Sequence, residues 1–250
     1  SHIVLLISLC SVMILVGCGK KEADNKLEEL VVLCGSSFPQ PMEQLCSEFT
    51  DQTGVKFATT VAGSENHLPL VKTAHEGDIF VTHDPFLDYV RDANGLLDYV
   101  QVGFVSPVLA VQKGNPKGIT GLQDLTRPGL KVALSNPEYS TCGEMVFALL
   151  EKKGIKEDVM KNVETLTKGH SDLGTLLKTK TVDAVMMWNG VAHTFRDSLD
   201  VVQTPYEYDE EIRVHIMGLS YTKHPESVKK FIEFCRQRGP AVFAEYGYVK

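Results

Sequence analysis

Four short clusters of glycine and hydroxyl residues stand where apolar segments end and helices are expected to begin. They are Gly35-Ser36-Ser37, Ala62-Gly63-Ser64, Ser140-Thr141-Cys142-Gly143 and Ser171-Asp172. The first N–H groups of a helix lack partners within the helix, and the helix dipole is positive at that end. Such a position binds an anion without a charged side chain. A single serine there is most simply an N-cap, but four clusters in corresponding places favour an anion site.

These clusters stand within an alternation of apolar runs and amphipathic segments, which indicates where they lie in the fold. Runs suited to buried strands cover 29–34, 55–61, 78–82, 130–134, 182–188 and 214–219. The first three are each followed by a predicted helix, which indicates a parallel sheet with helices on its faces. Asp84 and Pro85 suit the N-cap and first position of the third helix. In such sheets ligands collect at the carboxyl ends of the strands, where the clusters stand.

The alternation breaks and then restarts, which predicts two α/β lobes with a hinge between them. A strand at 105–111 has no helix after it, and the next series opens at 130. We expect residues 28–104 plus 214–250 to form the first lobe and residues 105–213 the second. The hinge is expected near Val105 and Val214.

The segment before the first lobe is typical of an export signal. Residues 3–17 are uncharged and mostly apolar, and the run is shorter than the roughly 20 residues of a membrane span. Leu15-Val16-Gly17-Cys18 resembles the bacterial lipoprotein signal. We therefore expect residues 1–17 to be a signal peptide, Cys18 to carry lipid and the polar residues 18–27 to be a flexible tether. A plain anchor helix is the alternative.

Charge and cysteine content narrow the function further. The 250 residues include 25 Lys+Arg and 32 Asp+Glu, a net charge of -7, which argues against nucleic-acid or anionic-membrane partners. No Cys-x-x-Cys pair occurs, so a zinc ribbon or redox dithiol is not expected. The sequence is still compatible with one disulfide, because the chain is expected to be exported. The four cysteines that it would draw on are Cys34, Cys46, Cys142 and Cys235.

Taken in order, several segments resemble the molybdate/tungstate-binding component of bacterial and archaeal ABC importers. They are residues 31–38, 61–64, 77–84, 136–143, 183–188 and 243–248. The resemblance implies a two-lobed periplasmic-binding-protein fold of type II. It also implies capture of a tetrahedral oxyanion and its delivery to a membrane permease, with no catalysis. We expect no cofactor and a monomer.

The same resemblance implies roles for single residues. Ser37 and Ser64 would bind the anion through their hydroxyls, with Ser36 and Thr141 beside them. Cys142 and Asp172 would offer backbone N–H groups, and Trp188 stands where bacterial members often have a tyrosine.

Three features depart from the family pattern, and the first is Trp188, which offers only an indole N–H donor from a bulkier ring. Pro69 suggests a late start for the second helix, and Glu65 and Asp172 bring negative charge to an anion site. Archaeal members coordinate the metal with carboxylates, so Asp172 and Glu211 are candidate ligands of molybdenum or tungsten. The alternative is that Asp172 is an N-cap and Glu211 a solvated surface charge.

Other functions remain open at this point. The same fold could bind sulfate, a phosphonate, a small organic anion or a metal cation. His67, His75 and His83 lie eight residues apart, but no i, i+4 pair of histidines occurs, so we expect them to be solvated. An enzyme is not expected, because hydrolase, zincin, P-loop and dinucleotide-binding motifs are missing. Cys142 at a helix N-terminus could be a nucleophile, but the sequence supplies no base for it.

Overall fold

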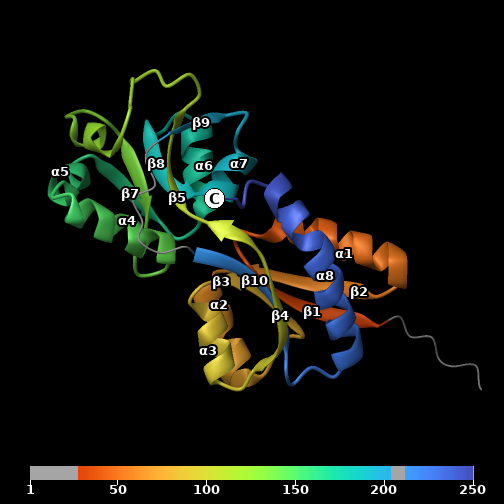
Figure 1. Ribbon diagram of the computed structural model, residues 1–250. Coiled ribbons are helices and arrows are strands. Elements are labelled where there is room, and N and C mark those ends of the chain that lie inside the picture. Colours follow the sequence, from red (N-terminus) through yellow and green to blue (C-terminus); the bar gives the residue numbers. More distant parts are fainter. Residues whose placement is uncertain (1–27, 204–211, 250) are drawn as a thin grey trace, which may run out of the picture.

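The computed structural model describes residues 28–203 and 212–249. Two five-stranded sheets, each flanked by helices, form two lobes that lie side by side (Figure 1). The predicted two-lobed α/β fold is confirmed, with each sheet mixed rather than wholly parallel. The predicted signal peptide, the tether with Cys18, and Glu211 lie outside the described residues. Within the described residues, no helix combines the length and apolar character that crossing a bilayer requires.

The first lobe is built on the sheet β2-β1-β3-β10-β4. Strands β2, β1 and β3 are parallel, and β10 runs antiparallel to both β3 and β4. Its elements are β1 (Glu29–Gly35), α1 (Pro39–Thr53), β2 (Lys56–Ala62), α2 (Ser64–Pro69), the π-helix η1 (Leu70–Ala74), β3 (Ile79–His83), α3 (Phe86–Asp92), β4 (Leu96–Val105), β10 (Ile212–Leu219) and α8 (Pro225–Glu245).

The second lobe is built on the sheet β7-β6-β8-β5-β9. Strands β7, β6 and β8 are parallel, whereas β5 runs antiparallel to β8 and β9. Its elements are β5 (Pro107–Gln112), the 3-10 helix η2 (Leu122–Thr126), β6 (Val132–Ser135), α4 (Thr141–Lys152), α5 (Lys156–Met160), β7 (Val163–Thr167), α6 (His170–Lys178), β8 (Ala184–Trp188), α7 (Asn189–Thr194) and β9 (Leu199–Val202).

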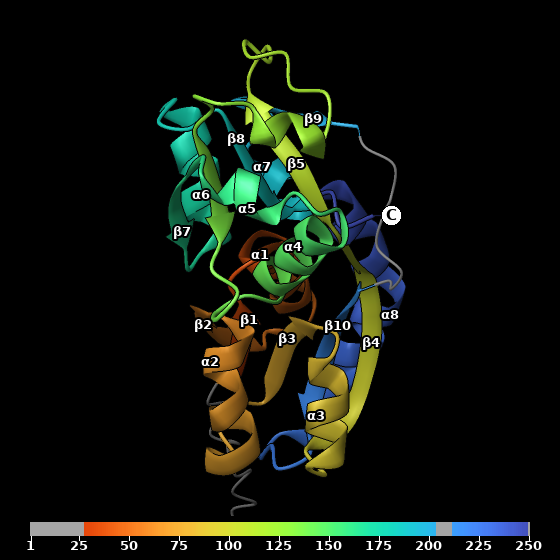
Figure 2. The ribbon, with the colours of Figure 1, turned by 90° about the vertical axis from the view of Figure 1, so that its left-hand side faces the viewer.

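The chain crosses between the lobes where β4 ends and β5 begins, with Ser106 alone between them (Figure 2). Asn189, the first residue of α7, ties down this crossing. Its side-chain oxygen accepts from the Ser106 N–H at 3.3 Å, and its own N–H donates to the Ser106 carbonyl at 3.0 Å. The side-chain nitrogen of Asn189, Nδ2, donates to the carbonyl oxygens of Phe104 and Val249. One side chain thus joins the crossing, the second lobe and the C-terminal segment.

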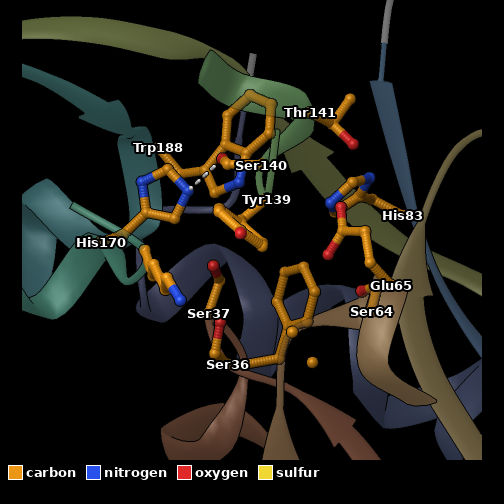
Figure 3. A pocket seen from close by; sticks show the side chains of 14 residues that line it. Ser36, Ser37, Ser64, Glu65, His83, Tyr139, Ser140, Thr141, His170 and Trp188 are labelled. Carbon is orange, nitrogen blue, oxygen red and sulfur yellow. Dashed lines mark hydrogen bonds between the residues drawn. The ribbon is translucent and has the colours of Figure 1, made fainter. Parts of the chain in front are cut away.

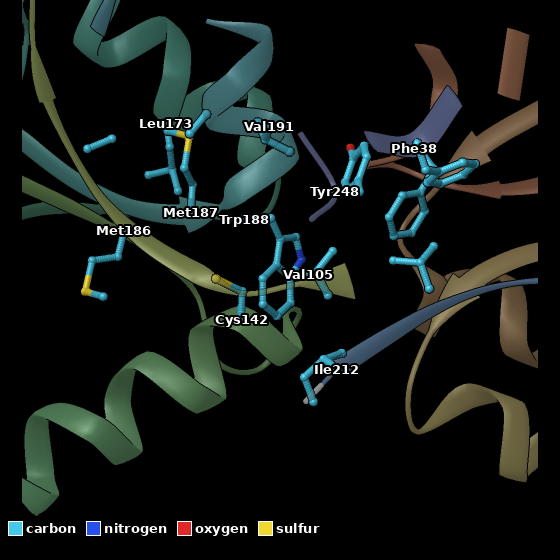
Figure 4. Packing of buried hydrophobic residues seen from close by; sticks show 14 of the residues in the cluster. Phe38, Val105, Cys142, Leu173, Met186, Met187, Trp188, Val191, Ile212 and Tyr248 are labelled. Carbon is cyan, nitrogen blue, oxygen red and sulfur yellow. The ribbon is translucent and has the colours of Figure 1, made fainter. Parts of the chain in front are cut away.

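Central strands are buried on both faces, which explains their continuous apolar sequences. Every residue of β3 and of β8 is buried. The core continues across the junction of the lobes, where Trp188 lies near Val105, Cys142 and Ile212 (Figure 4). A single core cluster therefore includes residues of both lobes.

The cysteines left open by the sequence are free thiols in the described chain. Cys34, Cys46, Cys142 and Cys235 are all buried and unpaired. Burial raises the pKa of the Cys46 thiol to about 12 and that of Cys142 well above its usual value. These thiols are small apolar core groups, and Cys142 lacks the lowered pKa that a nucleophile needs.

Three local expectations were wrong. The N-cap of α3 is Pro85, and the Asp84 carboxylate instead accepts from Arg213 Nε at 2.7 Å and pairs with His215 Nε2 at 2.9 Å. Helix α2 begins at Ser64, and Pro69 is accommodated because the chain continues beyond it as a π-helix. Helix α6 begins at His170, so the fourth cluster lies inside its first turn.

Candidate functional site

A small cavity lies between the two lobes and holds about 350 Å³ of empty space, counting open solvent (Figure 3). Residues at or just after the ends of β1, β2 and β3 line it from the first lobe. Residues near the starts of α4 and α6, with Trp188 at the end of β8, line it from the second lobe. The lining residues are Gly35, Ser36, Ser37, Phe38, Gly63, Ser64, Glu65, His83, Tyr139, Ser140, Thr141, Lys168, His170 and Trp188.

Ser64 is a hydrogen-bond donor whose hydroxyl is held in place. It is the first residue of α2 and is only 5% exposed. The buried Thr82 hydroxyl donates to Ser64 Oγ at 2.6 Å. Because Ser64 Oγ already accepts this bond, its own hydrogen is left to donate elsewhere. The neighbouring strand β3 therefore orients a hydroxyl donor at the cavity wall.

The turn after β1, rather than the N-terminus of α1, supplies hydrogen-bond donors at the cavity wall. Pro39 and Pro41 occupy the first and third positions of α1 and have no N–H group. Ser36 and Ser37, just before the helix, line this wall and carry hydroxyl and N–H groups that are able to donate. The turn is closed by the Phe38 N–H, which donates to the Gly35 carbonyl at 2.9 Å. The Tyr248 hydroxyl donates to the Ser37 carbonyl and fixes it from outside.

Helix α4 brings its N-terminus to the cavity from the second lobe. The Ser140 hydroxyl caps it by accepting from the Gly143 N–H at 3.3 Å. A Cβ at Gly143 would lie 2.7 Å from the Ser135 carbonyl oxygen, so glycine permits the close packing of α4 on the end of β6. Thr141, at the first position, lines the cavity with its side chain. The Cys142 thiol points into the core instead.

Two buried histidines flank Trp188 at the back of the cavity. The His170 ring lies 5.7 Å from the Trp188 ring, with its nitrogens 3.4 and 3.2 Å from the hydroxyls of Ser135 and Ser140. The His83 ring lies 5.5 Å from Trp188 on the first-lobe side, and its Nδ1 donates to the Asp84 carbonyl at 2.7 Å. Burial, then the charge of His83, lowers the pKa of His170 to about 3. Burial also lowers the pKa of His83.

Two charged side chains stand at the rim. Lys168 Nζ lies 4.4 Å from the centre of the Tyr139 ring, which places a positive charge beside the cavity. Glu65 reaches from α2, and its side chain lines the cavity together with Thr141 of the other lobe. Burial, above all, raises the pKa of Glu65.

The structure brings together five of the seven residues that were expected to bind the ligand. Ser36, Ser37, Ser64, Thr141 and Trp188 all line the cavity. The other two candidates, Cys142 and Asp172, are not among the lining residues: the Cys142 side chain is fully buried in the core, and Asp172 is exposed in the first turn of α6. The N–H contacts expected of these two residues stay predictions.

The expectation of solvated histidines was wrong for two of the three. His67 is 1% exposed, with Nε2 3.2 Å from the Cys34 carbonyl oxygen, and His83 is 6% exposed; His75 is exposed. His170, Lys168 and Tyr139 were missed by the sequence analysis. The sequence indicates these three residues only by their position, next to the predicted clusters at the starts of α4 and α6. Among the described residues, no group of three or more His, Cys, Asp or Glu is arranged to hold a metal ion.

The fold and the cavity define a class of protein: two α/β lobes that enclose a small polar site between them. Residues 30–249 match the family described as bacterial extracellular solute-binding protein, and the chain belongs to that family.

The names of proteins similar to this chain refer to different ligands. The molybdate-binding protein ModA of Mycobacterium bovis is 24% identical over 258 residues, covering 98% of this chain and 96% of the relative. The solved periplasmic molybdate-binding protein of Azotobacter vinelandii has a TM-score of 0.74 at 16% identity, covering 88% of this chain and 99% of that one. The solved sulfate-binding protein SubI of Mycobacterium tuberculosis has a TM-score of 0.74 at 15% identity, covering 88% of this chain and 86% of that one.

Proposed function

We propose that this chain captures a tetrahedral oxyanion, molybdate or tungstate, in the cavity between its lobes and delivers it to an ABC importer. One observation supports this most: the polar lining consists mainly of neutral hydrogen-bond donors that converge from both lobes. Serine hydroxyls and helix N-terminal N–H groups are suited to an anion that carries several acceptor oxygens. The relatives with names that include molybdate support the choice of anion.

Binding in this proposal needs no chemical step. The anion enters between the lobes, each lobe contributes donors, and closure about the crossing at Ser106 removes water from around it. Exclusion of water strengthens each hydrogen bond to the anion. The net charge of -7 does not oppose this, because neutral dipoles and the nearby Lys168 surround the ligand. The protein is a carrier and not an enzyme, and it uses no cofactor.

The proposed location follows from the N-terminal segment. Residues 1–17 would direct export, and Cys18 would carry the lipid that holds the protein at the extracytoplasmic face of the membrane. Residues 18–27 would let the two lobes reach the permease. Mass spectrometry of membrane-extracted protein tests this, because the proposal predicts a lipid-modified chain that begins at Cys18.

Another ligand of the same fold is the second candidate. The similarity to a sulfate-binding protein favours sulfate as the alternative anion, and a phosphonate or small organic anion would use the same donors. A metal cation is a weaker alternative. Direct coordination of molybdenum or tungsten by Asp172 is a separate proposal, and it would require this exposed side chain to turn into the cavity.

The only tryptophan of the chain provides the test. Trp188 lines the cavity, so its fluorescence reports directly on the site. Molybdate or tungstate should change the emission at submicromolar concentrations, with sulfate and phosphate much weaker. Stronger binding of sulfate would support the alternative anion. A signal that EDTA abolishes and oxyanions leave unchanged would support a cation and contradict the proposal.

A further inference from the structure

The His170 ring lies between two serine hydroxyls, one in the core and one at the cavity wall. Its Nδ1 atom is 3.4 Å from the hydroxyl of Ser135, the buried last residue of β6. Its Nε2 atom is 3.2 Å from the hydroxyl of Ser140, which lines the cavity (Figure 3). The Trp188 ring packs beside the imidazole. Ser135, His170 and Ser140 therefore form a chain of contacts that leads from the core to the cavity.

The imidazole of His170 is neutral at neutral pH, so its two nitrogens have opposite roles. Burial, above all, lowers the pKa of His170 to about 3. A neutral imidazole donates a hydrogen bond from one nitrogen and accepts one at the other. The hydrogen bond that each nitrogen makes decides which of them carries the hydrogen. The position of the His170 hydrogen and the directions of the two serine O–H groups are therefore coupled.

The Ser140 hydroxyl can take part in three hydrogen bonds, and the fold supplies two of the partners. It accepts from the Gly143 N–H at 3.3 Å and faces His170 Nε2. When Nε2 carries the hydrogen, Ser140 Oγ accepts from it and keeps its own hydrogen for the cavity. When Nδ1 carries the hydrogen, Ser140 donates to Nε2, and a lone pair is left for the cavity. Because an oxyanion without a proton only accepts hydrogen bonds, it binds the first arrangement and is repelled by the second.

Ser135 favours the arrangement that has the hydrogen on Nε2. Its side chain is only 2% exposed, and its hydroxyl can donate to His170 Nδ1 in that arrangement. In the other arrangement Ser135 accepts from Nδ1 instead. Among the described contacts its own hydrogen then has no second acceptor, and a buried hydroxyl without an acceptor is unfavourable. The core side of the chain of contacts thus directs the hydrogen of His170 toward Ser140.

We propose that His170 is a positioning residue for the oxyanion: with its hydrogen on Nε2, it leaves the Ser140 hydroxyl free to donate to the ligand from the second lobe. The inference rests on the proposed function, since it concerns the same cavity. In the first lobe, the buried Thr82 hydroxyl orients Ser64 Oγ in the same way. Each lobe therefore has a wall hydroxyl with a hydrogen that is directed by a partner behind it.

The first test measures which nitrogen of His170 carries the hydrogen. The chain has 8 histidines, so nuclear magnetic resonance uses the full chain with isotope-labelled histidine, and the His170 signals are those lost in His170→Gln. The protonated and the bare nitrogen of an imidazole resonate far apart, and their couplings to the ring hydrogens distinguish Nδ1 from Nε2. With tungstate bound, we expect the hydrogen on Nε2. A tungstate complex with the hydrogen on Nδ1 would overturn the proposal.

The second test measures tungstate affinity by isothermal titration. Ser140→Ala removes the donor and should weaken binding about 10- to 100-fold, as for a hydrogen bond to a charged group. His170→Leu leaves the hydroxyl undirected and should weaken binding about 2- to 10-fold. His170→Gln has an NH₂ group that can still donate to Ser140, so its affinity should stay within about threefold of the unchanged chain. Ser135→Ala should weaken binding about 2- to 5-fold, although this residue lies outside the cavity lining.

A control and a double variant show whether His170 acts through Ser140. His75→Leu is the matched control, because it makes the same change at an exposed histidine that stacks on Tyr221 outside the cavity lining. It should leave the affinity unchanged. The double variant Ser140→Ala, His170→Leu should lose no more affinity than Ser140→Ala alone, since both changes act on one hydroxyl. Urea unfolding of the same samples shows whether each variant is folded.

The outcomes separate this inference from the proposed function. Tight tungstate binding by the unchanged chain, with additive losses in the double variant, overturns the role of His170 and leaves the proposed function standing. Unchanged affinity in both His170→Leu and Ser135→Ala does the same. The hydrogen position is measured on the unchanged chain, so it decides the question even where His170→Leu does not fold. Failure of the unchanged chain to bind molybdate, tungstate or sulfate overturns both proposals.

Discussion

Removing the Ser64 hydroxyl should weaken oxyanion binding strongly, because this donor is oriented before the ligand arrives. In Ser64→Ala the anion loses one hydrogen bond from a group that Thr82 holds at 2.6 Å. A hydrogen bond to a charged group contributes about 1.5–3 kcal/mol. This corresponds to a loss of affinity of about 10- to 150-fold. The loss should be largest for the ligand that binds most tightly.

The same substitution should also destabilise the fold. Thr82 is fully buried, and Ser64→Ala leaves its hydroxyl without this acceptor. An unsatisfied buried hydroxyl costs about 1–3 kcal/mol. Thr82→Val removes the orienting bond but keeps the Ser64 hydroxyl, so its affinity loss should be about 2- to 10-fold, as for one neutral hydrogen bond. In the double variant the two losses should not add, since both act through one contact.

Calorimetric titration measures the affinities, and urea unfolding measures the stabilities of the same samples. Ser171→Ala is the matched control: it is an exposed serine in the first turn of α6 and lies outside the cavity lining. It should leave affinity and stability unchanged. A folded Ser64→Ala protein with affinity within twofold of the unchanged chain would refute the reasoning.

Three further predictions concern the packing of Gly190, the charge at the cavity rim and a buried histidine. A Cβ at Gly190 would lie 2.2 Å from Tyr248 Cε1, so Gly190→Ala should lower the free energy of unfolding by about 1–3 kcal/mol, while Gly121→Ala, with open space around it, should not. Equal urea midpoints would contradict this. Lys168→Gln should weaken oxyanion binding about two- to fivefold and flatten its dependence on salt, as expected for an exposed charge; unchanged affinity at low salt would contradict it. The pKa of His170 is about 3 in the fold against 6.5 in a free side chain, so the unfolded chain binds the proton first. Stability should therefore be full above pH 6.5 and fall toward pH 3, less steeply in His170→Gln.

Periodicity and local turn signals predicted most of the elements that hold the site. The buried strands β1, β3, β6 and β8 have nearly continuous apolar sequences, and their clusters of small residues follow directly. Three edge strands, β4, β7 and β9, were not predicted, and β4 mixes buried, half-buried and exposed residues along its length. β7 has three consecutive exposed residues and β9 only four residues in all, so neither has a hydrophobic pattern long enough to detect. Their pairing with β6 and β5 is set by tertiary contacts rather than by local sequence.

The cavity itself was predictable only in part. Ser37, Ser64 and Thr141 follow strands or start helices, and that position is visible in the sequence. Burial of a particular histidine depends on what packs over it, and for His83 and His170 this is Trp188. For His83 the tryptophan comes from a strand of the other lobe, distant in sequence. The true starting residue of α6 likewise depends on the end of β7, which the sequence does not mark. A shift of two residues is enough to bring His170, rather than Asp172, to the cavity.

Titration of the full chain with molybdate, tungstate, sulfate and phosphate, beside the Ser37→Ala, Ser64→Ala double variant, tests the central claim most directly. Both serines line the cavity from separate strand ends of the first lobe. We expect submicromolar binding of molybdate or tungstate by the unchanged chain, and loss of that binding in a double variant that remains folded. Equal affinity in the two proteins, or no submicromolar binding of either metal oxyanion, would contradict it.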